Sequence, residues 1–121
     1  MDRDTVNIAR DETERLISSK KVEGTQVYDS KGEKLGTIDS FMVEKRTGQV
    51  EYAVLASGGL FGASSRYYPL PWNELSYDTE KGGYVVSAGP EQIEGAPSYG
   101  EGEEPRFDSD YDDRVRGHYR R

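Results

Sequence analysis

The chain has 121 residues, of which 32% are charged, and carries a formal net charge of −7 at pH 7. This length fits one small domain with tails. The lack of cysteine excludes disulfides, thiolate metal sites and thiol catalysis. No apolar run approaches the roughly 18 residues of a membrane span, and the charged N-terminus is unlike a signal peptide, so we expect a soluble, cytoplasmic protein.

The negative charge is concentrated near the C-terminus. Residues 94–113 hold eight acids and a single base, Arg106, so the charges of the rest of the chain cancel. A neutral body with an acidic tail lacks the basic surface that binds a phosphate backbone. The charge pattern therefore argues against nucleic-acid binding.

The first elements in chain order are short. Residues 1–15 are expected to form a polar N-terminal extension, with a short helix after Asp11. Residues 16–24 are expected to form a turn or short helix that ends at Gly24. Strand-like runs separated by turn residues then follow at 25–29, 34–46, 50–57 and 84–87.

Residues 58–75, GGLFGASSRYYPLPWNEL, combine a glycine-rich loop with an aromatic and proline cluster. The glycines lack the lysine and spacing of a phosphate-binding loop, so we interpret them as a tight connection between strands. Pro69 and Pro71 favour an extended edge segment because each lacks a backbone N–H. Trp72, which follows, is expected to pack into the core.

Together these runs predict an all-β fold, a small antiparallel β-barrel of five to six short strands over residues 16–88. The expected core is Val22, Val27, Leu35, Ile38, Met42, Val50, Tyr52, Val54, Leu55, Leu70, Trp72, Leu75 and Val85. The run at 50–57 is apolar on both faces, whereas a free-standing small barrel needs only one apolar face per strand. This surplus predicts a cover, supplied by the protein's own tail or by a second subunit.

Residues 89–121 are expected to form an acidic C-terminal extension, docked or partly disordered. Residues 89–97 fit one helical turn with Pro90 at its first position. The remainder has the composition of a disordered segment, yet it retains Tyr99, Phe107, Tyr111 and Tyr119. These aromatic residues favour docking on the barrel or on a neighbouring subunit.

Tests for chemistry give no catalytic, cofactor or metal site. The run DSDYDD at 108–113 begins like a calcium loop, but Asp113 stands where glycine is needed and Tyr119 where a bidentate glutamate is needed. His118, the only histidine, lies near the chain end without the partners of a triad or a zinc site. The carboxylate pairs of the body fit solvent-facing positions: Glu23 with Asp29, Glu33 with Asp39, and Glu44 with Glu51. We expect no enzyme and no cofactor.

The order of these pieces resembles the PRC-barrel domain family. The matching features are V-Y-D-x-x-G-E-x-L-G-T-I at 27–38, T-G-x-V-x-Y-A-V-L at 47–55, the glycine pair at 58–59, and P-L-P-W-x-x-L at 69–75. The family includes the cytoplasmic part of the photosynthetic reaction centre H subunit and the C-terminal domain of the ribosome maturation factor. The resemblance covers about half the chain and implies a stand-alone bacterial member without catalytic residues. The specific roles of those two relatives do not transfer, because this chain lacks their additional parts.

The leading functional hypothesis is a non-enzymatic protein-interaction module, self-associating as a homodimer or higher oligomer and binding a protein partner. Two alternatives stay open: a ribosome- or RNA-associated factor, by analogy with the maturation factor, and a sensor of a small ligand or metal. The candidate contact residues are Ala53, Leu55, Leu60, Phe61, Tyr67, Tyr99, Phe107 and Tyr111.

Overall fold

The computed structural model describes residues 16–58 and 65–120 of the chain. The helix predicted after Asp11, and the candidate contact residues Leu60 and Phe61, lie outside the described residues. The strands are β1 (Gln26–Tyr28), β2 (Lys34–Val43), β3 (Val50–Ala56), β4 (Arg66–Pro71), β5 (Leu75–Asp78), β6 (Gly83–Val86) and β7 (Tyr99–Gly100). The helices are α2 (Ser19–Val22), the 3-10 turn η3 (Trp72–Glu74), α3 (Pro90–Glu94) and α4 (Ser109–Tyr119).

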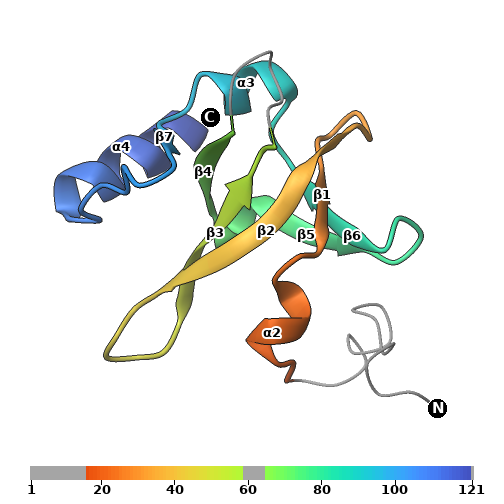
Figure 1. Cartoon of the computed structure of the whole chain (residues 1–121), viewed down its shortest axis with the longest axis horizontal. Helices are drawn as coiled ribbons and strands as arrows, with labels where there is room; N and C mark the ends of the chain where they lie inside the picture. Colours follow the sequence, from red (N-terminus) through yellow and green to blue (C-terminus); the bar gives the residue numbers. More distant parts are fainter. Residues whose placement is uncertain (1–15, 59–64, 121) are drawn as a thin grey trace.

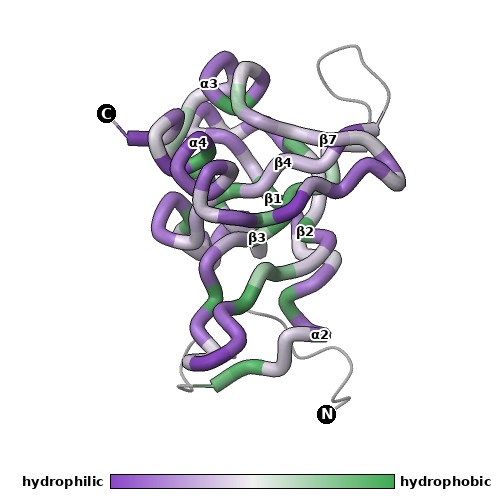
Figure 2. The backbone as a smooth tube through the Cα atoms, turned by 90° about the vertical axis from the view of Figure 1, so that its left-hand side faces the viewer, coloured by the Kyte–Doolittle hydropathy of each residue, from purple (hydrophilic) through white to green (hydrophobic). Residues whose placement is uncertain are grey.

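The seven strands form a single sheet in the order β5-β6-β1-β2-β3-β4-β7. Figure 1 shows a strongly curved sheet, with α3 and α4 together on one side and α2 at the opposite end. Figure 2 shows hydrophobic segments near β1, β2 and β3, and also beside α2 and α3, whereas much of the connecting backbone is hydrophilic. The predicted fold class, a small all-β barrel fold, is confirmed.

The turn between β1 and β2 is fixed by a buried carboxylate. Asp29 is 1% exposed, and its Oδ1 accepts the backbone N–H groups of Lys31 at 2.8 Å and Glu33 at 3.0 Å. Gly32, between them, has φ 89°, a conformation that glycine adopts without strain. This local motif sets the register in which β2 returns along β1.

The two faces of β3 are buried against different parts of the chain. Residues paired directly across two strands share a face, which groups Ala53 and Leu55 with Leu70 and Tyr68. These four side chains form the inner face, and all are 1–3% exposed. On this side Phe41 contacts Trp72, which in turn contacts Tyr84.

The other side of β3 and β4 forms what we call the outer face, Tyr52 and Val54 with the buried prolines Pro69 and Pro71. Helix α4 packs on β4 at this face (Figure 1). Its residues Tyr111, Val115 and Tyr119 join the hydrophobic core. The cover over the doubly apolar third strand therefore comes from the C-terminal segment of the same chain.

Pairing differs from the predicted antiparallel barrel at one place. β1 pairs in parallel with β6, through Val27 opposite Tyr84 and Tyr28 opposite Val85. The chain returns to the first strand after the whole β2–β5 segment, so this pairing leaves no local turn signal. None of the described helices has the length and apolar character needed to cross a membrane.

Candidate functional site

A surface cleft lies between the β2–β3 hairpin and the start of α4. On the hairpin side, one carboxylate organises the turn. Glu44 Oε1 accepts the backbone N–H groups of Arg46 at 2.8 Å and Thr47 at 2.9 Å. The hydrogen bond from Thr47, and then that from Arg46, lowers the pKa of Glu44. Glu44 thus keeps its charge and its position at the edge of the cleft.

The helix side begins at Asp108, which caps α4. Its Oδ1 accepts the backbone N–H of Tyr111 at 3.0 Å, the hydrogen bond expected of an N-cap aspartate. Acidic residues lie in the first turn of α4 and basic ones in the last, an order that suits the helix dipole. Phe107, immediately before the cap, contacts the rings of Tyr52 at 6.0 Å and Tyr111 at 4.9 Å.

Four side chains bind the two walls together. The hydroxyl of Tyr52 donates a hydrogen bond to Asp112 Oδ1, and Arg116 Nε donates to the same oxygen at 2.9 Å. Arg116 Nη2 also donates to Glu51 Oε1 at 2.6 Å, and the guanidinium lies 4.8 Å from the ring centroid of Tyr52.

This arrangement keeps the phenol of Tyr52 protonated. Burial, and then the hydrogen bond to Asp112, raises the pKa of Tyr52 well above its usual value. A neutral phenol can donate to the carboxylate, whereas a phenolate would repel it. The Tyr52 hydroxyl therefore remains a hydrogen-bond donor throughout the neutral range.

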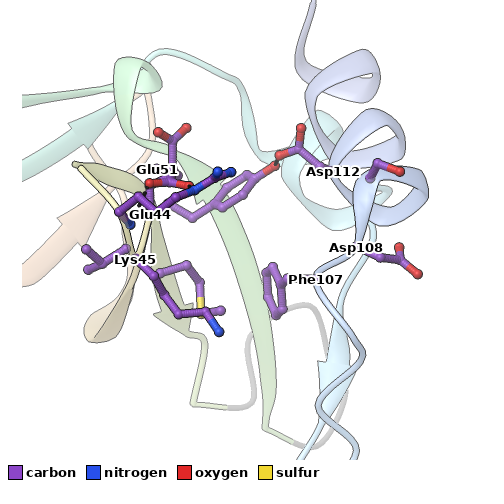
Figure 3. Close-up of a pocket in the computed structure, with 11 residues that line it drawn as sticks. Glu44, Lys45, Glu51, Phe107, Asp108 and Asp112 are labelled. Atoms are coloured by element: carbon purple, nitrogen blue, oxygen red, sulfur yellow. Dashed lines mark hydrogen bonds and ion pairs between the residues drawn. The ribbon is translucent and has the colours of Figure 1, made fainter. Parts of the chain in front are cut away.

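The cleft has a volume of about 730 Å³. In Figure 3 the labelled residues Glu44, Lys45 and Glu51 come from the hairpin, whereas Phe107, Asp108 and Asp112 come from the opposite wall. Between them the lining is mostly apolar, with Met42, Val43, Tyr52 and Phe107. Val43 is 48% exposed, one of three large hydrophobic residues exposed in the described part of the chain, with Leu16 and Ile17. An exposed apolar patch with a charged rim is typical of a docking surface.

Among the described residues, the cleft contains no serine–histidine pair. Its hydroxyl candidate, Ser109, has no histidine beside it, because His118 binds elsewhere: the ring Nε2 lies 2.6 Å from the carbonyl oxygen of Gln92, and the Gln92 side chain donates back to the His118 carbonyl at 3.0 Å. These two contacts fasten α4 to α3. Within residues 16–58 and 65–120, no group of three or more histidine, aspartate or glutamate side chains is placed to hold a metal ion.

The structure separates the predicted contact residues into two groups. Ala53 and Leu55 are each 1% exposed and point into the barrel, so neither is open to a partner. The other described candidates form one row of ring contacts: Tyr67 with Tyr99 at 5.6 Å, Tyr99 with Phe107 at 6.5 Å, and Phe107 with Tyr111 at 4.9 Å. Of this row, only Phe107 reaches the cleft.

Sequence reasoning missed the charged members of the site. The sequence pattern predicts solvent-facing positions for Glu44 and Glu51, and it places Asp112 in a C-terminal extension that is docked or partly disordered. A signal was present in the tail, where Tyr111, Val115 and Tyr119 recur every four residues, the spacing of one helix face. With Asp108 as a cap and an Asp112–Arg116 pair one turn apart, that pattern indicates an amphipathic helix.

Comparison with known proteins identifies the fold. The model of the PRC-barrel domain family matches residues 14–93, about two thirds of the chain, and the chain belongs to that family. A search of curated proteins found no match. Among solved structures, the chain is similar to a Pseudomonas aeruginosa protein assigned as the 16S ribosomal RNA processing protein RimM.

The likeness to that structure is distant. The two share 19% sequence identity with a TM-score of 0.43, and the match covers 75% of this chain and 50% of the other. The chain thus spans about half the length of that relative, and nothing about function follows from so low a score. Helix α4, which forms one wall of the cleft, lies beyond the residues that match the family.

Proposed function

We propose that this protein is a non-enzymatic interaction module that binds a segment of a partner protein in the cleft between the β2–β3 hairpin and α4. The observation that supports this function most directly is the apolar lining around the exposed Val43. Barrel and helix both contribute to it, so the site belongs to the folded chain as a whole. PRC-barrel membership supports a binding role, since the family carries no catalytic residues over to this chain.

The test is affinity capture with the full chain and two single variants. Val43→Asp places a charge in the apolar cleft, whereas Glu80→Gln changes an exposed residue of the β5–β6 turn, away from the cleft (Figure 1). We expect Val43→Asp to lose the proteins that the unmodified chain retains, and Glu80→Gln to keep them. Equal capture by all three proteins would refute a docking role for the cleft.

Self-association stays a prediction. Its sequence argument was the surplus apolar face of the third strand, and α4 of the same chain now accounts for that face. Light scattering on a sizing column provides the test, with more than one chain per particle as the expected result of the sequence argument. A monomer would leave the binding role of the cleft unaffected.

A further inference from the structure

We propose that the outer face of β3 and β4 is a helix-binding surface, on which an amphipathic helix of a partner protein replaces α4. This inference rests on the proposed function and names the partner as a helix with apolar side chains at positions i, i+4 and i+8. Helix α4 itself shows what the surface accepts, because Tyr111, Val115 and Tyr119 occupy it at that spacing and are at most 5% exposed.

Two buried hydroxyls make α4 an imperfect occupant. Tyr111 and Tyr119 are 5% and 2% exposed, and neither hydroxyl has a hydrogen-bond partner among the described residues. A hydroxyl buried without a partner loses its bonds to water and gains none in return. A helix with phenylalanine or leucine at these two places would fill the same space without that loss, so it would bind the surface more tightly than α4 does.

The polar contacts of α4 define the rest of the partner's chemistry. On the barrel, Glu51 receives a hydrogen bond from Arg116, and the Tyr52 hydroxyl needs an acceptor, which Asp112 supplies. A replacing helix must therefore carry an acid directly after its first apolar residue and a base directly after its second. The side chains of Arg116, Glu51 and Asp112 are 30–40% exposed. Ion pairs this accessible contribute more to the specificity of binding than to its affinity.

The connection of α4 to the barrel favours exchange. Residues 101–106 contain a turn and no strand or helix, and most of them are exposed. An isolated helix of 11 residues is marginal in water, so α4 depends on its docking and can leave by local unfolding while the sheet stays folded. Because the family match ends at residue 93, α4 is an addition to the shared domain.

The cleft gives a partner its first contact. It borders the first turn of α4 through Ser109 and Asp112, and its apolar lining is open before α4 moves. A partner segment seated there lies beside the surface that α4 covers. Binding in the cleft and replacement of α4 are thus two successive contacts of one interface.

Native-state hydrogen exchange of the unmodified full chain tests the release of α4 without any substitution. We expect the amides of α4 to exchange through an opening of lower free energy than those of β3, whose residues Tyr52–Leu55 are buried on both faces. Equal opening free energies for α4 and β3, with the same dependence on denaturant, would show that α4 leaves only with global unfolding. That result would overturn the proposal.

Peptide binding to the full chain tests the surface itself. The probes are a fluorescent peptide copying residues 105–120 and a second copy with Tyr111→Phe and Tyr119→Phe. We expect both to bind a Val115→Asp chain, whose own α4 is displaced, more tightly than the unmodified chain. The phenylalanine peptide should bind about fivefold more tightly for each hydroxyl removed.

Matched controls isolate the helix face. A peptide carrying Val115→Asp should bind neither chain, and a chain with the exposed Asp113→Asn should behave like the unmodified one. Absence of peptide binding to a Val115→Asp chain with an intact sheet would overturn the proposal. If that variant does not fold, hydrogen exchange of the unmodified chain tests the proposal instead. Affinity capture of a partner can depend on Val43 even if the peptide does not bind. The two experiments therefore test the cleft function and the replacement of α4 separately.

Discussion

Arg116 shows how one side chain on α4 orients the contact with the barrel. Its guanidinium lies over the ring of Tyr52 and donates hydrogen bonds to Asp112 and Glu51. Planar guanidinium groups suit this combination of a ring face and carboxylates. The side chain is about a third exposed, so its contribution lies mainly in fixing the rotation of the helix, whereas burial of Tyr111, Val115 and Tyr119 provides most of the stabilisation.

The buried tyrosines of α4 predict an unusual gain in stability on substitution. Tyr111→Phe and Tyr119→Phe each remove a buried hydroxyl that has no partner among the described residues and should raise the free energy of unfolding by about 1 kcal/mol. Urea denaturation measures the change. Tyr52→Phe is the control, since it removes a hydroxyl that donates to Asp112, and it should lower stability. A loss of stability in both α4 variants would show that their hydroxyls are paired.

Two tyrosines, Tyr99 of β7 and Tyr119 of α4, predict sensitivity to alkaline pH. Burial raises the pKa of Tyr99 to about 12 and raises that of Tyr119 further. The unfolded chain, with ordinary phenols, releases these protons near pH 10, while the folded chain retains them. The raised pKa values therefore stabilise the fold fully below pH about 10, and this contribution is lost as the pH rises through the folded values.

Urea unfolding across a pH series measures this effect, with phenolate absorbance as a second observable. We expect the free energy of unfolding to fall above pH about 10, less steeply in the Tyr119→Phe variant. A folded chain in which every tyrosine ionises near pH 10 would contradict the burial of these phenols.

At the scale of elements, the close approach of β2 to β3 predicts that the sheet requires a glycine at position 36. A Cβ at Gly36 would overlap the backbone carbonyl oxygen of Ala56, and neither strand can shift without losing its ladder. Gly36→Ala should lower the free energy of unfolding by about 1–3 kcal/mol. Gly117→Ala, in α4, meets nothing within 4 Å and should raise it by about 0.5–1 kcal/mol. Equal urea midpoints for these two variants would contradict the observed packing of the strands.

The elements also differ in how far the sequence predicts them. The strands β1, β2, β3 and β6 lie within or close to their predicted runs, because β-branched and aromatic residues alternate there between clear turn signals. Helix α4 was missed, since its acidic composition favours a solvated segment unless the four-residue spacing of Tyr111, Val115 and Tyr119 is counted. The acidic composition of residues 109–119 thus favours a disordered segment, although their spacing of apolar residues is that of a helix.

At the scale of the whole molecule, the family and the all-β fold were predictable, whereas the site was not. Motifs in a fixed order identify the barrel without any knowledge of its pairing. The cleft depends on contacts between residues such as Tyr52 and Asp112, 60 positions apart, which local patterns do not reveal. Local patterns also fail to predict which residue of β6 faces the core. Val86 is fully buried, whereas Val85, the residue predicted for the core, is only half-buried.

The central claim is that a partner protein contacts the cleft between the β2–β3 hairpin and α4. Photo-crosslinking from position 43 of the full chain tests it most directly, with position 80 in the β5–β6 turn as the control. We expect one defined product from position 43 that is absent from position 80. The same products from both positions, or none from position 43, would contradict the claim.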